Sequence, residues 1–390
     1  KQFYWHRFFH HQPDLNFEEP RVMEEMLDAV RFWMDLGIDG FRLDAVPYLI
    51  EAEGTNCENL PGTHKILKQL RAMVDEEYPG RILLCEANQW PDDVVEYFGN
   101  GDECQMAFHF PVMPRLYMGL RRGSRECISE ILAHTPHIPD GCQWGTFLRN
   151  HDELTLEMVT EEDRHYMWEE YAPESRWRCN LGIRRRLSPL VDNDDAKIRL
   201  LNAMLLSLPG SPVLYYGDEI GMGDDPWLPD RDGVRTPMQW DDSETAGFST
   251  ALPEDFHLPL IRTFGHDPEH VNVARQMDDP SSLLVWTRAM LGIRRHHPVF
   301  GTGEFTDLGG PDMAVMSFLR HNEHETVLCL ANFSDTERMV ALHLPQFAGM
   351  TGSSLIHGQD AQPVKADGTL SVPLWPYGYR WLQVSREERS

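Results

Sequence analysis

Three apolar runs along this 390-residue chain each lead to an acidic residue, and this repetition constrains the fold more than any other feature. Asp44 follows the run 40–43, Glu86 follows 82–85, and Asp152 lies three residues after the strand-like run 146–149. In barrels of alternating strands and helices, catalytic side chains lie at the carboxyl ends of the strands. The pattern therefore predicts three strands of one sheet with acids at a shared edge. For each acid alone, a loop residue that caps a neighbouring helix is an open alternative.

The first two thirds of the chain alternate helical and strand-like segments. Val22, Met26, Val30 and Trp33 recur at helical spacing between residues 20 and 36. Further helices are predicted at 63–78, 124–134 and 196–208, and strands at 41–46, 81–86, 105–110, 146–149 and 213–216. A closed (β/α)8 TIM barrel needs eight strands. We therefore interpret these five as strands 4–8 of such a barrel and expect its first three strands upstream of this numbering.

After Pro298 the pattern changes to short strand-like stretches at 314–319, 326–332, 339–344 and 379–384. With turn signals between them, they predict an antiparallel β-sandwich domain. We place the barrel at residues 1–300 and the β-sandwich at 301–390. The Asp-, Pro- and Gly-rich stretch 217–268 is too long for a plain connection and predicts active-site loops.

The charge of the chain excludes several classes of partner. It has 62 acidic and 35 basic residues, a formal net charge of -27, which argues against nucleic acid or an anionic membrane and favours a neutral small molecule. No apolar run approaches 18 residues, so no membrane span is expected. Seven cysteines without a CxxC pair favour a reducing, cytoplasmic compartment. A homo-oligomer is an open possibility.

Carboxylates at neighbouring strand ends can cleave an acetal, one as nucleophile and the other as proton donor. Arg42 lies two residues before Asp44, so both side chains point to the same face of a strand, and the guanidinium can keep the nucleophile ionised. Glu86 follows an apolar strand, which can raise its pKa toward that of a general acid. Asp152 can then hold the sugar and stabilise positive charge in the transition state.

These segments resemble the α-amylase family of glycoside hydrolases, in which a barrel carries Asp, Glu and Asp after its fourth, fifth and seventh strands. Residues 40–44, Glu86 and 150–152 are similar to the family's nucleophile, acid/base and stabiliser segments, and 12–16 resembles a segment of the oligo-1,6-glucosidase branch. The family's Asp/Asn/His segment after strand three is absent from this numbering. Longer strings resemble the trehalose synthases within that family: 44–49, 53–61, 86–91, 150–157, 231–240 and 375–381.

That resemblance implies reversible isomerisation of maltose to trehalose by a retaining double displacement through a glucosyl-enzyme intermediate, with some side hydrolysis. It further implies that Arg42 and His151 contact the substrate. It also implies that one set of residues holds the acceptor glucose, and that two arginines pin the donor site or its loop. The acceptor set is Tyr48, Asn88, Glu153 and Glu157, and the arginines are Arg231 and Arg235. Two alternatives stay open: Glu153 and Glu157 as first-turn helix acids, and His151 as a histidine satisfied by backbone.

Relatives in the family hold a structural Ca²⁺ near the nucleophile strand. The resemblance implies oxygen donors here from Asp14, Glu51 and the carbonyls of Tyr48 and Leu49, and no organic cofactor. Three competing functions stay open. A maltase or oligo-1,6-glucosidase would let water attack the same intermediate, a sucrose isomerase would differ in substrate, and a non-catalytic amylase-like partner protein would tend to lose the three acids.

Overall fold

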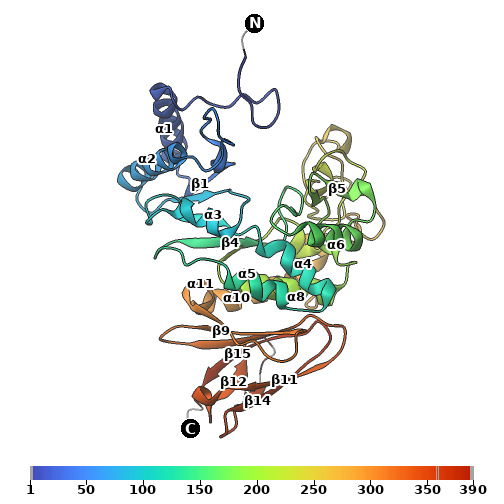
Figure 1. Ribbon diagram of the computed structural model, residues 1–390. Helices are drawn as coiled ribbons and strands as arrows, with labels where there is room; N and C mark the ends of the chain where they lie inside the picture. Colours follow the sequence, from blue (N-terminus) through green and yellow to red (C-terminus); the bar gives the residue numbers. More distant parts are fainter. Residues whose placement is uncertain (1–2, 357, 359, 387–390) are drawn as a thin grey trace. The chain divides into compact units, whose positions relative to one another are not determined.

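The structure is a computed structural model that describes residues 3–356, 358 and 360–386. The chain divides into two compact units (Figure 1). The first comprises residues 1–110 and 134–145, and the second comprises 111–133 and 146–390. These units differ from the predicted division near residue 300, which stays a prediction.

The first unit contains parallel strands and two long helices. Strands β1 (Gly40–Leu43), β2 (Ile82–Cys85), β3 (Met106–Phe108) and β4 (Gln143–Phe147) pair in this order, and β4 continues into the second unit. Helix α1 (Pro20–Asp35) begins with Pro20 behind a Glu19 cap, and α2 (Pro61–Glu77) begins with Pro61. Short turns of helix, η1 (Val46–Tyr48), α3 (Pro91–Val94) and η2 (Val95–Phe98), lie in the connections. The predicted alternation of helix and strand is confirmed here, with ends shifted by one to three residues.

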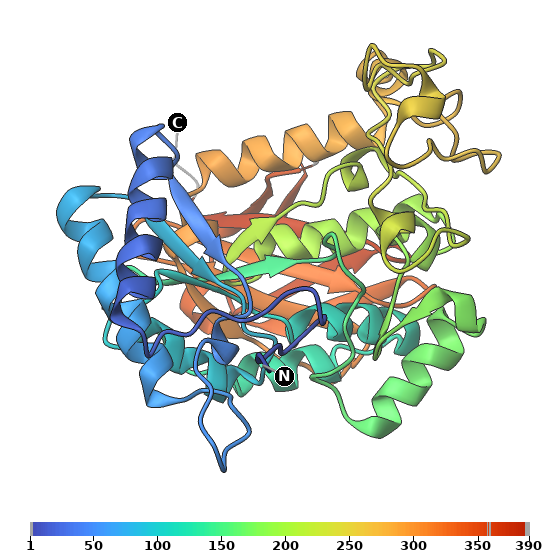
Figure 2. The ribbon, with the colours of Figure 1, turned by 90° about the horizontal axis from the view of Figure 1, so that it is seen from above.

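The core of the first unit lies between α1, α2 and the strands, which Figure 2 shows side by side. Helix α1 buries Met23, Leu27 and Met34 together with Val30. Met26 is 40% exposed and Trp33 is 50% exposed. The predicted helix is confirmed, but most of the residues that indicated it do not form its buried face. Two apolar stripes run side by side along this helix, and packing against α2 selects one of them.

The second unit contains most of the remaining helices and the strand β7 (Ser211–Val213), fifth in the sheet order after β4. The longer helices are α4 (Val112–Arg122), α5 (Glu126–Ala133), α6 (Glu161–Tyr171), α8 (Asp195–Ser207) and α10 (Leu283–His296). The shorter ones are α7 (Leu187–Leu190), α9 (Val273–Met277), α11 (Val299–Thr302) and η3 (Ser175–Trp177). A small hairpin pairs β5 (Arg178–Cys179) with β6 (Gly182–Ile183).

Between β7 and α9 the chain forms a long irregular segment. It contains only three short turns of helix, η4 (Asp218–Ile220), η5 (Asp232–Val234) and η6 (Pro253–Asp255). The predicted long loop over 217–268 is therefore confirmed as a loop. Helix α4 was not predicted, and its residues 112–120, Arg115 among them, are all buried.

The C-terminal part of the second unit is antiparallel β-structure, as predicted. One sheet has the order β13-β12-β15-β10-β9-β8 and a second pairs β11 with β14. These strands are β8 (Glu304–Asp307), β9 (Val315–His321), β10 (Thr326–Asn332), β11 (Arg338–His343), β12 (Thr351–Ser354), β13 (Ala361–Pro363), β14 (Thr369–Leu374) and β15 (Tyr379–Ser385), with η7 (Pro345–Phe347) between β11 and β12.

Side chains from both C-terminal sheets share one core. Leu342 and Val372 of the small sheet pack in it with Leu328 and Leu382 of the larger sheet. This is the arrangement of a β-sandwich. Helix α8 contacts β10, which joins this core to the helices of the second unit (Figure 1). Among the residues that the structure describes, no helix combines the length and apolar character needed to cross a membrane.

Candidate active site

The carboxyl ends of β1 and β2 place two of the predicted catalytic acids next to each other. Leu43 is paired with Cys85 in the parallel register, so Asp44 and Glu86 are the next residues on neighbouring strands. The backbone N–H of Glu86 donates to the Leu43 carbonyl at 3.0 Å, which extends the pairing to the site. The predicted position of these acids at strand ends is therefore confirmed.

Arg42 joins the two acids through its guanidinium group. Its Nη1 donates to Asp44 Oδ1 at 2.8 Å, and its Nη2 donates to Glu86 Oε2. The side chain of Asp44 is 74% exposed, whereas that of Glu86 is 18% exposed. One cation thus holds both carboxylates, and their different exposure gives them different environments.

Burial is the main reason why the pKa of Glu86 rises from 4.5 to about 7. The neighbouring Asp44 carboxyl raises this pKa further, and Arg42 opposes the rise. The sequence predicted this rise in the Glu86 pKa from the apolar strand that precedes it. A carboxyl with a pKa near neutrality can give up a proton in one step and take one in the next, which is the requirement for an acid/base group.

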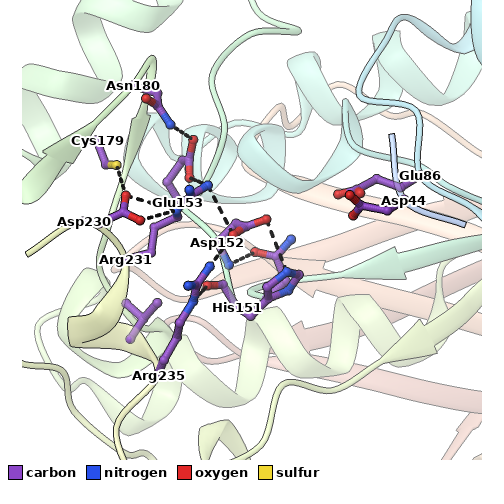
Figure 3. Close-up of polar contacts among 12 residues, drawn as sticks. Asp44, Glu86, His151, Asp152, Glu153, Cys179, Asn180, Asp230, Arg231 and Arg235 are labelled. Atoms are coloured by element: carbon purple, nitrogen blue, oxygen red, sulfur yellow. Dashed lines mark hydrogen bonds and ion pairs between the residues drawn. The ribbon is translucent and has the colours of Figure 1, made fainter. Parts of the chain in front are cut away.

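Asp152 belongs to the second unit, in the loop that follows β4. Arg235 Nη2 donates to its Oδ1 at 2.7 Å, and Arg231 Nη1 lies 3.4 Å from the same oxygen (Figure 3). The Asp152 N–H donates to Asn150 Oδ1 at 3.0 Å, and Arg149 Nη2 donates to the Asp152 carbonyl at 2.7 Å. Both the backbone and the carboxylate of Asp152 are therefore held in place.

Arg231 and Arg235 link the loop 217–268 to the segment around Asp152. Arg235 Nε donates to the His151 carbonyl at 2.6 Å, and Arg231 Nη1 lies 3.4 Å from Glu153 Oε2. This is the loop-pinning contact that the resemblance implied for the two arginines. Their contact with a donor sugar stays a prediction.

The predicted acceptor residues are divided between the units. Tyr48, in η1, lies beneath the Arg7 guanidinium at 4.3 Å, and Asn88 is a partly buried residue after β2. Glu153 is 12% exposed and accepts from Asn180 Nδ2 at 2.7 Å, whereas Glu157 is exposed. All four stay predictions as substrate contacts.

One alternative role for Glu153 and Glu157 can now be excluded. Helix α6 begins at Glu161 behind a Thr160 cap, and its first-turn acids are residues 161–163. Glu153 and Glu157 lie before this cap and are not first-turn helix acids.

The side chain of His151 is 48% exposed, with Nε2 3.4 Å from Asp152 Oδ2. It therefore lies beside a predicted catalytic carboxylate, with part of its surface open to solvent.

The surroundings of Glu51 bear on the predicted calcium ligands. Its Oε1 is buried without a hydrogen-bond partner, and burial together with the nearby Asp14 carboxylate raises its pKa. Two facing carboxylates with an unsatisfied oxygen fit a hard cation. Within the described residues no cluster of three or more His, Cys, Asp or Glu side chains could hold a metal, so backbone carbonyls such as those of Tyr48 and Leu49 would have to complete the set.

Sequence reasoning missed two residues that support the site. Arg149 is almost fully buried, and its Nε also donates to the Arg185 carbonyl at 2.6 Å. Asn180 reaches Glu153 from the β5–β6 hairpin, where its φ of +50° is left-handed. The sequence places Arg149 beside Asn150, but no local pattern shows that its side chain points inward, and nothing local relates Asn180 to Glu153.

Comparisons with known proteins agree with this description. The model "Alpha amylase, catalytic domain" matches residues 1–173 and 174–303, and "Maltogenic Amylase, C-terminal domain" matches 309–381. Among solved structures, an α-amylase from H. orenii has a TM-score of 0.74 at 20% identity, with 97% of this chain and 67% of that chain covered. The chain belongs to the α-amylase family. Its predicted barrel fold with a C-terminal β-domain is thereby confirmed, whereas the position of three strands upstream stays a prediction.

Individual relatives point to a smaller group within this family. A trehalose synthase/amylase TreS of Mycobacterium tuberculosis is 56% identical over all of this chain and 66% of its own length. A trehalose synthase of Pimelobacter is 56% identical over 98% of this chain and 69% of its own. The chain thus spans about two thirds of the length of these relatives. The predicted resemblance to trehalose synthases is confirmed.

Proposed function

We propose that this protein interconverts maltose and trehalose by a retaining double displacement. The observation that carries the proposal is the Arg42-bridged pair of Asp44 and Glu86, in which the buried member has a pKa of about 7. Relatives named trehalose synthase at 56% identity support this choice of substrates. Carbohydrate is also consistent with the acidic chain, because a neutral sugar is not repelled by it.

In the first step Asp44 attacks the anomeric carbon of the non-reducing glucose of maltose. Glu86 donates its proton to the glycosidic oxygen, so the C–O bond breaks and glucose leaves while a glucosyl ester forms on Asp44. Asp152 binds sugar hydroxyls and stabilises the oxocarbenium-like transition state. Its grip on the sugar depends on Arg235 and Arg231, which fix its Oδ1.

In the second step the released glucose turns and presents its own anomeric hydroxyl. Glu86, now ionised, removes the proton from that hydroxyl, and the oxygen attacks the glucosyl carbon to displace Asp44. The product is trehalose, and Glu86 regains its proton. Water must be excluded throughout, because it would attack the same ester and give two glucose molecules.

Incubation of the intact protein with maltose tests the proposal when the products are followed by NMR. Trehalose should appear, and trehalose given alone should return maltose. Glucose alone, without trehalose, would contradict the isomerase and favour a hydrolase, the activity named for a probable α-glucosidase of Rhizobium meliloti at 28% identity. In the Asp44→Ala variant turnover should be lost with the thermal midpoint retained, and substantial residual turnover would refute the nucleophile assignment.

The calcium site and the compartment belong to the same proposal. Asp14, Glu51 and the carbonyls of Tyr48 and Leu49 would hold Ca²⁺, which would supply structural support without a role in bond breaking. Added Ca²⁺ should raise the melting temperature of the chelator-treated protein, and Glu51→Gln should abolish that rise.

A cytoplasmic location is supported by the seven cysteines, all described and all free. It would be refuted by finding the protein outside the cell.

A further inference from the structure

A cavity of about 270 Å³ lies in the second unit, among α4, the end of α6, the segment after α7, the start of α8 and the turn before β15. Leu120, Leu190 and Val191 form its buried apolar floor, and the polar side chains around it come from five different segments. At about 30 Å³ of liquid volume per water, the space holds on the order of nine waters. That is the scale of one sugar ring with its hydroxyl groups.

Two lining residues are held in backbone conformations that L-residues seldom adopt. Tyr377 has a φ of +52° and Asp192 a φ of +59°, both in the left-handed region. The Tyr377 N–H donates to the Ser334 carbonyl at 3.0 Å, and the Asp192 N–H donates to the Pro189 carbonyl at 3.3 Å. At a bulky residue such as Tyr377 this conformation is strained, and such strain persists where the surrounding structure imposes it, commonly at ligand sites. Tyr377 also belongs to the string 375–381, to which the proposed reaction assigns no role.

The polar groups of the cavity have hydrogen-bonding capacity that the protein leaves unused. Within the described residues, the Tyr377 hydroxyl and Lys197 Nζ make no hydrogen bond, although Lys197 Nζ lies 3.6 Å from Asp194 Oδ2. Asp192 Oδ2 lies 4.0 Å from Arg121 Nη1, too far for a hydrogen bond. Lys197 Nζ also lies 5.3 Å from the centre of the Tyr377 ring, and Arg121 Nε donates to Glu170 Oε2. The Tyr377 hydroxyl and the Asp192 carboxylate therefore carry the capacity that a ligand can use. Sugar hydroxyls offer both donors and acceptors, so they can bond to a phenol and to a carboxylate.

The charge of the cavity favours a neutral ligand. Arg121 and Lys197 supply two positive charges, but Glu170 is paired with Arg121 at 2.5 Å and Asp194 with Lys197. Together with Asp192, these side chains give the cavity a net negative charge. An anion such as phosphate would therefore be repelled. We propose that this cavity is a second carbohydrate-binding site, which takes one neutral pyranose unit. The proposal goes beyond the proposed function, because it needs no reaction at Asp44.

Selective ¹⁵N-tyrosine labelling of the intact protein tests the site directly. The amide signal of Tyr377, identified by its loss in Tyr377→Phe, should shift saturably when glucose or maltose is added. In Asp192→Asn, which keeps a residue suited to positive φ, the midpoint at Tyr377 should rise about tenfold or more. The matched control Asp195→Asn, at an exposed acid three residues further on, at the start of α8 and outside the cavity, should leave it unchanged.

Three results would overturn the proposal. They are the absence of a saturable shift at Tyr377, a midpoint that Asp192→Asn leaves unaltered, and a shift produced by inorganic phosphate that the sugars displace. The Tyr48 signal reports the first unit in the same spectra. A shift at Tyr377 without maltose turnover would therefore support the second site while refuting the proposed function, so the two can fail separately.

Discussion

Replacement of Glu86 by glutamine should stabilise the fold at alkaline pH while it removes the chemistry. The folded protein holds the Glu86 proton more tightly than the unfolded chain, because burial raises the pKa from 4.5 to about 7. The folded state therefore loses stability as the pH rises from about 4.5, and the loss is complete above pH 7. Over about 2.5 pH units, at about 1.4 kcal/mol per unit, the loss amounts to about 3 kcal/mol.

Glutamine has nearly the same shape as glutamate and is neutral at every pH, so the variant should not suffer this loss. Glu86→Gln and the parent protein should have similar free energies of unfolding at pH 4.5. At pH 8 the variant should be more stable by about 3 kcal/mol, although it should not turn over maltose. This stabilisation by loss of a functional group is the expected sign of an active-site residue that is strained by its environment.

Urea unfolding followed by fluorescence at both pH values measures the difference, provided that one transition is seen. Glu76→Gln is the matched control, because Glu76 is exposed on α2. Its effect should be small and equal at the two pH values. If the gap between Glu86→Gln and the parent does not widen with pH, Glu86 is not a buried carboxyl with a raised pKa, and the acid/base assignment loses its physical basis.

Two further predictions concern the arginines of the site. Arg42→Gln removes the cation that lowers the Glu86 pKa, so the alkaline limb of kcat/KM for maltose should move to higher pH; a move to lower pH would contradict the assigned direction. Arg235→Gln removes the donor to Asp152 Oδ1, so kcat/KM should fall about 100-fold with the thermal midpoint nearly unchanged, and a fall below about threefold would show that Asp152 does not depend on this contact.

The strand ends of this chain were predictable because their signal is local. An apolar run followed by an acid defines where a strand stops, and parallel pairing of Leu43 with Cys85 then brings Asp44 and Glu86 together. The start of α1 is equally local, since Pro20 follows an acidic cap. In these cases the residues that specify the structure are neighbours in the sequence.

The remaining features depend on partners that are distant in the sequence. Arg235 and Asp152 are 83 residues apart, and no spacing rule relates them. The buried stripe of α1 was misjudged because Met26 and Trp33 satisfy helical spacing as well as Met23 and Met34 do. Periodicity indicates that a helix has an apolar side, but the choice between two adjacent stripes is made by the surface that covers one of them.

In the proposed reaction, transfer and hydrolysis share the same ester, so we expect the predicted active-site loop 217–268 to govern the choice between glucose and water as the final acceptor. The tyrosines after β7 hold part of that loop: Tyr216 Oη donates to the Thr236 carbonyl at 2.6 Å, next to Arg235. Tyr216→Phe removes this hydrogen bond and keeps the ring that lies 4.7 Å from the Arg186 guanidinium.

We expect Tyr216→Phe to raise glucose release relative to trehalose formation several-fold, with little change in the rate of maltose consumption, since Asp44 and Glu86 are untouched. NMR of the products gives both rates in one experiment. Tyr166→Phe, on helix α6 and outside this loop, is the control and should leave the ratio unchanged. An unchanged ratio in Tyr216→Phe would mean that water is excluded by other contacts, whereas a loss of both rates would place the loop in the bond-breaking step itself.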